Sequence, residues 1–131
     1  MKLTRETDYA IRIALCLSAR DTHLAAREIA EQMKVTHTFT LKILHKLTRA
    51  GFVKSVQGVA GGYKLVKKPD KISLLEIVEI IEGPLAINAC LQEQYICERL
   101  EKERCPVHNT LEELNGLIRG ELDKRLISNY I

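Results

Sequence analysis

Hydrophobic positions recur at helical spacing through the first fifty residues of the chain. Over residues 8–19, small and apolar side chains return at the period of a helix, which predicts a first, mostly buried helix. A short second helix is expected over residues 26–33, with its apolar residues on one side. After a tight connection, Thr36 is placed to cap a third helix that runs to about residue 50.

The third predicted helix has two contrasting faces. Its apolar residues point inward: Phe39, Ile43, Leu44 and Leu47. Four polar residues share the opposite face, spaced at i, i+4, i+7 and i+11: Thr38, Lys42, His45 and Arg49. Two short extended runs follow at 52–57 and 63–66, and a glycine-bearing turn at 58–62 joins them.

Helix, short helix, tight turn, basic helix and hairpin is the order of a winged helix-turn-helix. In that fold the third helix enters the major groove of DNA, and the hairpin lies along the backbone or in the minor groove. We therefore predict a mainly α fold with a small β wing. The alternative interpretation is a small α+β core that happens to be basic.

The second half of the chain is expected to hold two further helices around an irregular segment. Ser73 and Glu76 have the spacing of a capping box and begin a helix that Gly83 ends. Pro106 opens a last helix of more than twenty residues, with an apolar stripe along it: Leu111, Leu114, Ile118, Leu122 and Leu126, with Leu117 beside them. One small domain cannot cover so long a stripe, so we expect a homodimer interface; packing on its own domain is the alternative.

Charge is distributed unevenly along the chain. Residues 1–72 carry 14 Lys and Arg against 6 Asp and Glu, whereas residues 73–131 carry 6 against 11. No acidic residue lies between Glu31 and Asp70, where eight basic residues fall. An acid-free basic stretch suits a polyanion, because phosphates attract Lys and Arg through counterion release. Together with the predicted fold, it indicates double-stranded DNA as a partner.

Composition excludes several classes. No apolar run reaches the 18 residues that a membrane span needs, and residues 1–7 are polar, so we expect a cytoplasmic protein without a membrane partner. The sequence has no glycine-rich phosphate loop and no convincing set of nucleophile, base and orienting group. We therefore expect neither an enzyme nor a small-molecule substrate.

Three cysteines crowd into sixteen residues, Cys90, Cys97 and Cys105, and His108 follows the last by three positions. In a reducing cytosol such a group indicates a metal, a cluster or redox chemistry more often than a structural disulfide. The fourth cysteine, Cys16, lies among apolar residues of the first helix and is expected to be a core residue.

Three further segments resemble a known family. These are Thr-Arg-Glu-Thr-Asp-Tyr-Ala near the start, Ala-Gly-Phe-Val-Lys-Ser-Val-Gln-Gly-Val-Ala-Gly-Gly-Tyr at 50–63 and Ile-Ser-Leu-Leu-Glu-Ile at 72–77. With the late cysteines, they resemble bacterial winged-helix iron-sulfur regulators of the IscR and NsrR type. The resemblance implies a homodimeric transcription factor that binds an iron-sulfur cluster, either 2Fe-2S or 4Fe-4S, through Cys90, Cys97 and Cys105. Its DNA affinity would depend on the state of that cluster.

The resemblance offers two candidates for the fourth ligand. His108 matches a histidine of the IscR type, and the partner subunit's Asp8 matches an aspartate used by some relatives of the NsrR type. Arg12 lies one helical turn after Asp8, and such a pair is usually an ordinary surface interaction. We favour His108, because a ligand close to Cys105 in sequence costs less entropy to bring into the site.

Two features depart from the family pattern. Six and seven residues separate the cysteines here, against about five in the pattern, and a flexible loop tolerates such insertions at small entropic cost. Gln57 stands in the wing where relatives commonly carry an arginine, which would alter or weaken readout of the minor groove.

The predicted site and organisation follow from these features. Residues 1–72 form the DNA-binding region, and residues 73–131 hold the cluster-binding loop and the dimerisation helix of one compact dimeric unit. The predicted DNA-binding residues are Thr36, His37, Thr38, Lys42, Lys46, Arg49, Lys54, Gln57, Tyr63 and Lys64. Two alternatives remain: a zinc-stabilised regulator and a thiol-switching regulator without a cluster.

Overall fold

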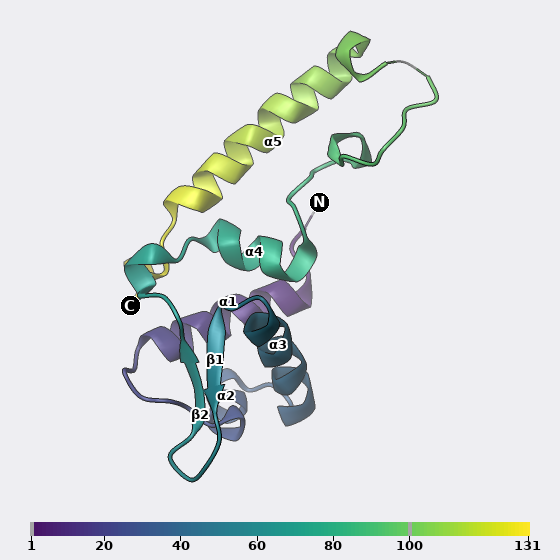
Figure 1. The fold of residues 1–131 in the computed structure, drawn as a ribbon. Coiled ribbons are helices and arrows are strands. Elements are labelled where there is room, and N and C mark those ends of the chain that lie inside the picture. The colour runs from purple at the N-terminus through teal and green to yellow at the C-terminus, as the bar shows by residue number, and fades with distance from the viewer. Residues whose placement is uncertain (1, 100) are drawn as a thin grey trace.

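The computed structural model describes residues 2–99 and 101–131, and its elements form a winged helix-turn-helix with a long helical extension (Figure 1). The order is α1 (Arg5–Ser18), α2 (Ala26–Met33), α3 (His37–Arg49), β1 (Val53–Val56), β2 (Gly62–Leu65), α4 (Leu74–Glu82) and α5 (Pro106–Lys124). Short 3₁₀ turns lie at Pro69–Lys71, Ala89–Leu91, Lys102–Arg104 and Ile127–Tyr130. The predicted fold class is therefore confirmed.

The first helix starts earlier than the apolar pattern indicated. It begins at Arg5, because the hydroxyl of Thr4 accepts a hydrogen bond from the Thr7 amide at 3.3 Å and caps the helix. On its buried side, Ile13 and Leu17 lie in the core, whereas Ile11 and Leu15 are half-buried. For α2 and α3 the predicted ranges are confirmed.

The core joins both halves of the chain. It contains fully buried residues from α1, α2, α3, α4 and the turn before α4: Ala10, Ile29, Ile43, Leu44, Leu47, Ile77 and Ile72. Val53 of β1 and Leu65 of β2 are buried in the same cluster. Ile127, near the C-terminus, is also fully buried in this cluster. The Ile127 amide donates to the Ile72 carbonyl at 2.9 Å, and the Leu74 amide donates to the Arg125 carbonyl at 2.8 Å. These bonds hold the end of the chain against the start of α4.

This return of the chain corrects the prediction for the last helix. Helix α5 has 19 residues and ends at Lys124, so it is shorter than predicted, and Leu126 is not part of its stripe. Leu126 instead bridges to Ser73. Ser73 caps α4 as predicted, since its hydroxyl accepts from the Glu76 amide at 3.2 Å. The Glu76 side chain, however, pairs with Lys67 at 2.5 Å instead of closing a capping box.

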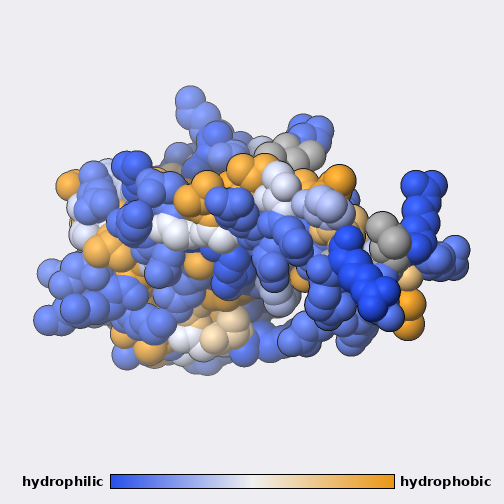
Figure 2. Space-filling model, turned by 90° about the horizontal axis from the view of Figure 1, so that it is seen from above, coloured by the Kyte–Doolittle hydropathy of each residue, from blue (hydrophilic) through white to orange (hydrophobic). Residues whose placement is uncertain are grey.

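Helix α5 extends away from the winged unit on the far side of α4 (Figure 1). The described chain buries none of the 19 residues of this helix. Val107 is 65% exposed, Leu117 62% and Leu114 45%. Seen from above, apolar side chains reach the surface among polar ones (Figure 2). In the described parts of the chain, no helix is long and apolar enough to cross a membrane.

Candidate nucleic-acid interface and cysteine segment

Helix α3 contains five of the ten residues predicted to contact DNA, and its exposed face carries several of them. Thr38, Lys42, His45 and Arg49 are exposed, as the spacing predicted. His37 is exposed at the start of the helix. Thr36 caps α3, because its hydroxyl accepts from the Phe39 amide at 3.3 Å. That hydroxyl is therefore engaged with the backbone of α3 in this structure.

An acidic residue of α1 lies against this basic face. The Glu6 carboxylate binds Lys42 through Oε1 at 2.6 Å and Lys46 through Oε2 at 2.5 Å. Hydrogen bonds from Lys42 and then Lys46 lower the pKa of Glu6, although partial desolvation acts in the opposite direction. No acidic residue lies between Glu31 and Asp70 in the sequence, but in the folded chain Glu6 of α1 lies against α3.

The wing presents two like charges side by side. In the antiparallel pairing of β1 with β2, Lys54 lies directly opposite Lys64. Like charges directly opposite each other destabilise a sheet, and an anionic partner relieves that repulsion. The Lys64 ammonium also donates to the Asp21 carbonyl at 2.5 Å. The hairpin therefore carries a compact cationic surface.

Two glycines and one backbone bridge fix the wing. A Cβ at Gly61 would collide with the Val56 carbonyl, and one at Gly62 would collide with the backbone of Leu24. Tyr63 is half-buried and exchanges two backbone hydrogen bonds with Leu24, of 2.8 and 3.0 Å. Gln57 is exposed beside the turn. The wing is thus tied to the loop that precedes α2.

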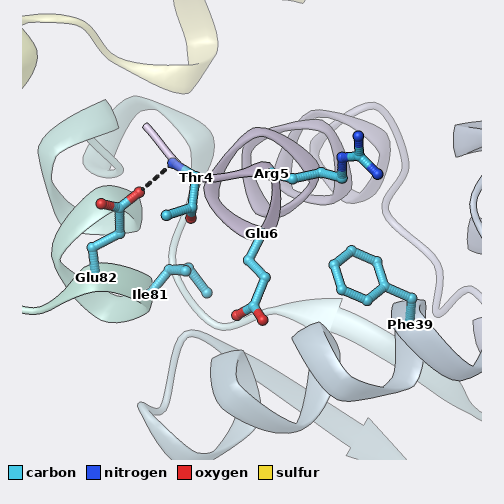
Figure 3. Close-up of a pocket in the computed structure, with 6 residues that line it drawn as sticks. All are labelled: Thr4, Arg5, Glu6, Phe39, Ile81 and Glu82. Carbon is cyan, nitrogen blue, oxygen red and sulfur yellow. Dashed lines mark hydrogen bonds between the residues drawn. The ribbon is translucent and has the colours of Figure 1, made fainter. Parts of the chain in front are cut away.

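A groove of about 570 Å³ lies where α1, α3 and α4 meet (Figure 3). It is lined by Thr4, Arg5, Glu6, Phe39, Ile81 and Glu82. Glu82 Oε1 accepts from the Thr4 amide at 2.8 Å and from the Thr7 hydroxyl at 2.5 Å. Desolvation tends to raise the pKa of Glu82, but the bonds from Thr7 and Thr4 outweigh it and lower the pKa. The end of α4 is thereby fastened to the start of α1.

Polar contacts with α5 fix the segment that leads from α4 to the cysteines. The Asn115 amide oxygen accepts from the Ile87 amide, and its nitrogen donates to the Leu85 carbonyl, both at 3.0 Å. Glu79 of α4 pairs with Arg119 of α5 and accepts from the Leu85 amide. The start of residues 83–108, called the cysteine segment below, is therefore held to both α4 and α5.

All four cysteines are thiols, and the three predicted ligands are half-buried. Cys105 caps α5, and Asn88 donates to the Cys90 sulfur at 3.1 Å. Within residues 2–99 and 101–131, no group of three or more Cys, His, Asp or Glu side chains is close enough to hold a metal ion. Cys16 is 8% exposed, as predicted for a core residue, and burial raises the pKa of its thiol.

The two candidates for the fourth ligand differ in their surroundings. The His108 amide lies 3.4 Å from the Cys105 sulfur. Its Nδ1 atom is buried and has no hydrogen-bond partner among the described residues. Asp8 is exposed and pairs with Arg12 at 3.0 Å, the surface interaction that its spacing indicated.

Together, the fold, the basic helix and the cationic wing define a DNA-binding protein of the winged helix-turn-helix class. The family profile Rrf2, described as iron-dependent transcriptional regulator, matches residues 3–129. The chain therefore belongs to the Rrf2 family of transcriptional regulators. This confirms the family resemblance in the sequence and implies DNA binding.

Individual relatives agree with this assignment. An HTH-type transcriptional regulator of Aquifex aeolicus is 34% identical over 121 residues, which is 92% of this chain and 84% of the relative. IscR of Aliivibrio salmonicida is 29% identical over 125 residues, or 94% of this chain and 73% of the relative. The solved structure of CymR, the global cysteine regulator of B. subtilis, shares the fold with a TM-score of 0.81. It is 21% identical, and the match covers 99% of this chain and 95% of that one.

Sequence reasoning missed the acidic and polar residues that join the elements. The main ones are Glu6, Glu79, Glu82, Asn115 and Arg119. Their partners are distant in sequence, so periodicity carries no signal for them.

Proposed function

We propose that this protein is a homodimeric transcriptional regulator whose DNA affinity is controlled by an iron-sulfur cluster. Cys90, Cys97, Cys105 and His108 would hold the cluster. The observation that carries the proposal is the position of these residues in one segment, which joins α4, fastened to the winged unit, to α5.

For DNA, the proposal assigns roles by position. At the N-terminal end of α3, Thr36, His37, Thr38 and Lys42 approach base edges. Four basic residues contact phosphates: Lys46, Arg49, Lys54 and Lys64. Gln57 and Tyr63 place the wing beside the groove. The exposed face of α3 and the opposed lysines of the wing support this arrangement.

For the dimer, the proposal places α5 at the interface. Val107, Leu114 and Leu117 are exposed on one side of the helix, whereas Asn115 and Arg119 contact α4 and the start of the cysteine segment on the other. Apolar residues exposed in a row are typical of a surface that a second copy covers. A twofold pair would also match a palindromic DNA site.

The donor chemistry fits an iron-sulfur cluster. Thiolates are its usual ligands, and histidine replaces cysteine in some clusters. His108 is supported as fourth ligand by its buried Nδ1, which has no hydrogen-bond partner in residues 2–99 and 101–131, and by its backbone amide, which lies against the Cys105 sulfur. The engagement of Asp8 with Arg12 makes the partner subunit's Asp8 the second choice. A bound cluster supplies one-electron redox chemistry and reactivity toward oxidants; this donor set is compatible with both 2Fe-2S and 4Fe-4S.

Coupling to DNA would run through the two ends of the cysteine segment. The cysteine segment begins just after Glu82, which holds Thr4 and Thr7 of the α1 N-terminus. A rearrangement of residues 88–108 would therefore pull on the same turn of α1 that carries Glu6. At the other end, the segment leads into α5 and so sets the angle between the two subunits.

Anaerobic purification tests the cluster. We expect visible absorbance with iron and acid-labile sulfide in the wild type, loss of all three in Cys97→Ala, and retention in Cys16→Ala. A colourless protein that contains stoichiometric zinc would contradict the cluster and support the zinc-stabilised alternative. The DNA-binding part of the proposal would stand in either case.

A thiol-switching regulator is the second candidate. It is favoured by one observation: in the described chain the three thiols are not gathered into a metal site. This function predicts no iron, sulfide or zinc, and a DNA affinity that changes on treatment with a disulfide reagent and recovers with reductant.

A further inference from the structure

Glu6 occupies a position that bears directly on DNA affinity. Each of its two carboxylate oxygens holds one lysine of α3, at 2.6 Å for Lys42 and 2.5 Å for Lys46. The side chain of Glu6 is 24% exposed, less than those of either lysine. Both lysines are among the residues that the proposed interface needs for DNA.

The backbone of α1 holds Glu6 at this place. Glu6 lies in the first turn of α1, where the helix dipole favours a negative charge. Thr4 caps that turn, and Thr4 and Thr7 both bond to Glu82 of α4. The lowered pKa of Glu6 means that its carboxylate stays ionised at neutral pH. The two lysines therefore face a fixed anion within their own chain.

We propose that Glu6 limits the affinity for DNA by competing with base edges for Lys42 and with phosphate for Lys46. The inference rests on the proposed docking of α3 on DNA. In the free protein each ammonium is paired with Glu6. Binding to DNA must replace that pair, so each lysine contributes only the difference between its contact with DNA and its contact with Glu6. When DNA binds, the displaced carboxylate lies near the phosphates and recruits a cation.

Arg49 differs from these lysines. It is exposed on the same helix and forms no ion pair with any residue in the described ranges. Its contribution to DNA binding is therefore independent of Glu6. This makes Arg49 a test of the docking itself.

The experiment measures binding to a short duplex selected by the protein from a randomised pool. Glu6→Gln, which is nearly isosteric, removes two ion pairs, each worth up to about fivefold at a surface. It is therefore expected to bind about three- to tenfold more tightly. The slope of log K against log salt concentration should become steeper by up to about one. Glu112→Gln is the matched control: it removes one negative charge from an exposed position of α5, across α4 from α3.

Variants of the two lysines test whether the effect of Glu6 depends on them. In the Lys42→Gln, Lys46→Gln background, which should bind more weakly than wild type, Glu6→Gln should give no gain. The inference is overturned if Glu6→Gln does not bind more tightly, if Glu112→Gln gains as much, or if the gain persists without the lysines. It is also overturned if removing both lysines leaves affinity unchanged.

Arg49→Gln distinguishes an error in the docking of α3 from an error in the role of Glu6. If this variant loses affinity while Glu6→Gln gains none, the docking stands and only the role of Glu6 is wrong. If Arg49→Gln binds like the wild type, the docking of α3 is wrong and the role of Glu6 falls with it. Circular dichroism of each variant checks that the fold is retained.

Discussion

Replacing Leu117 by glutamate is expected to convert the proposed dimer into a monomer. Leu117 is 62% exposed on α5, on the side that faces away from α4. Full burial of a leucine side chain is worth about 1.5–3 kcal/mol, so covering the exposed part of Leu117 contributes about 1–2 kcal/mol per subunit. Twofold symmetry counts the contact twice, which gives about 2–4 kcal/mol, or roughly 30- to 900-fold in the dimer Kd.

The assay is sedimentation equilibrium over a range of protein concentrations. Leu117→Glu should shift the monomer–dimer transition upward by at least the factor above, because two carboxylates would also meet at the interface. Asn109→Glu, which adds the same charge on another side of α5, should leave the transition unchanged. A wild-type dimer Kd in Leu117→Glu would refute the placement of the interface on this side of α5.

Three further predictions concern the rest of the molecule. Arg49→Gln should weaken binding to DNA of any sequence and reduce the salt slope by about one, measured by fluorescence anisotropy between about 50 and 200 mM salt; an unchanged slope would exclude a phosphate contact. Ile127→Ala should lower the free energy of unfolding by about 2–5 kcal/mol in urea, because it empties a fully buried site where the C-terminal turn meets the core; a loss below about 0.5 kcal/mol would mean that this turn is not anchored. Glu82→Gln should destabilise the protein at neutral pH by up to about 1 kcal/mol and by less as pH falls, with the difference closing once Glu82 is protonated in the folded state. The sign follows from the lowered pKa of Glu82: the stabilisation is present above the ordinary carboxyl pKa and is lost as pH falls through the folded-state pKa, so a gap in melting temperature that widens in acid would contradict it.

Local features of the sequence were sufficient to predict the winged helix-turn-helix. The cap at Thr36 and the two faces of α3 depend on residues within a few positions of each other, so periodicity and capping chemistry predict them. The wing followed from two extended runs around a glycine-bearing turn. The same reasoning placed the start of α1 too late, because the Thr4 cap precedes the first apolar residue of the pattern.

The remaining features depend on contacts between distant parts of the chain. Glu6 lies 36 residues from Lys42 in sequence, and no spacing rule connects them. The end of α5 was also beyond local reasoning, since the stripe continues to Leu126 but the chain turns to bury Ile127. The three cysteines lie close in sequence, but among the described residues they do not form a group of ligands close enough to hold a metal ion.

The most direct test of the account compares the DNA affinity of three anaerobic samples: cluster-loaded wild type, wild type after removal of iron, and Cys97→Ala. The account predicts that the loaded protein differs from the other two by tenfold or more on the selected duplex, and that the iron-free protein and Cys97→Ala agree with each other. Equal affinity in all three samples would contradict control of DNA binding by the cysteine segment.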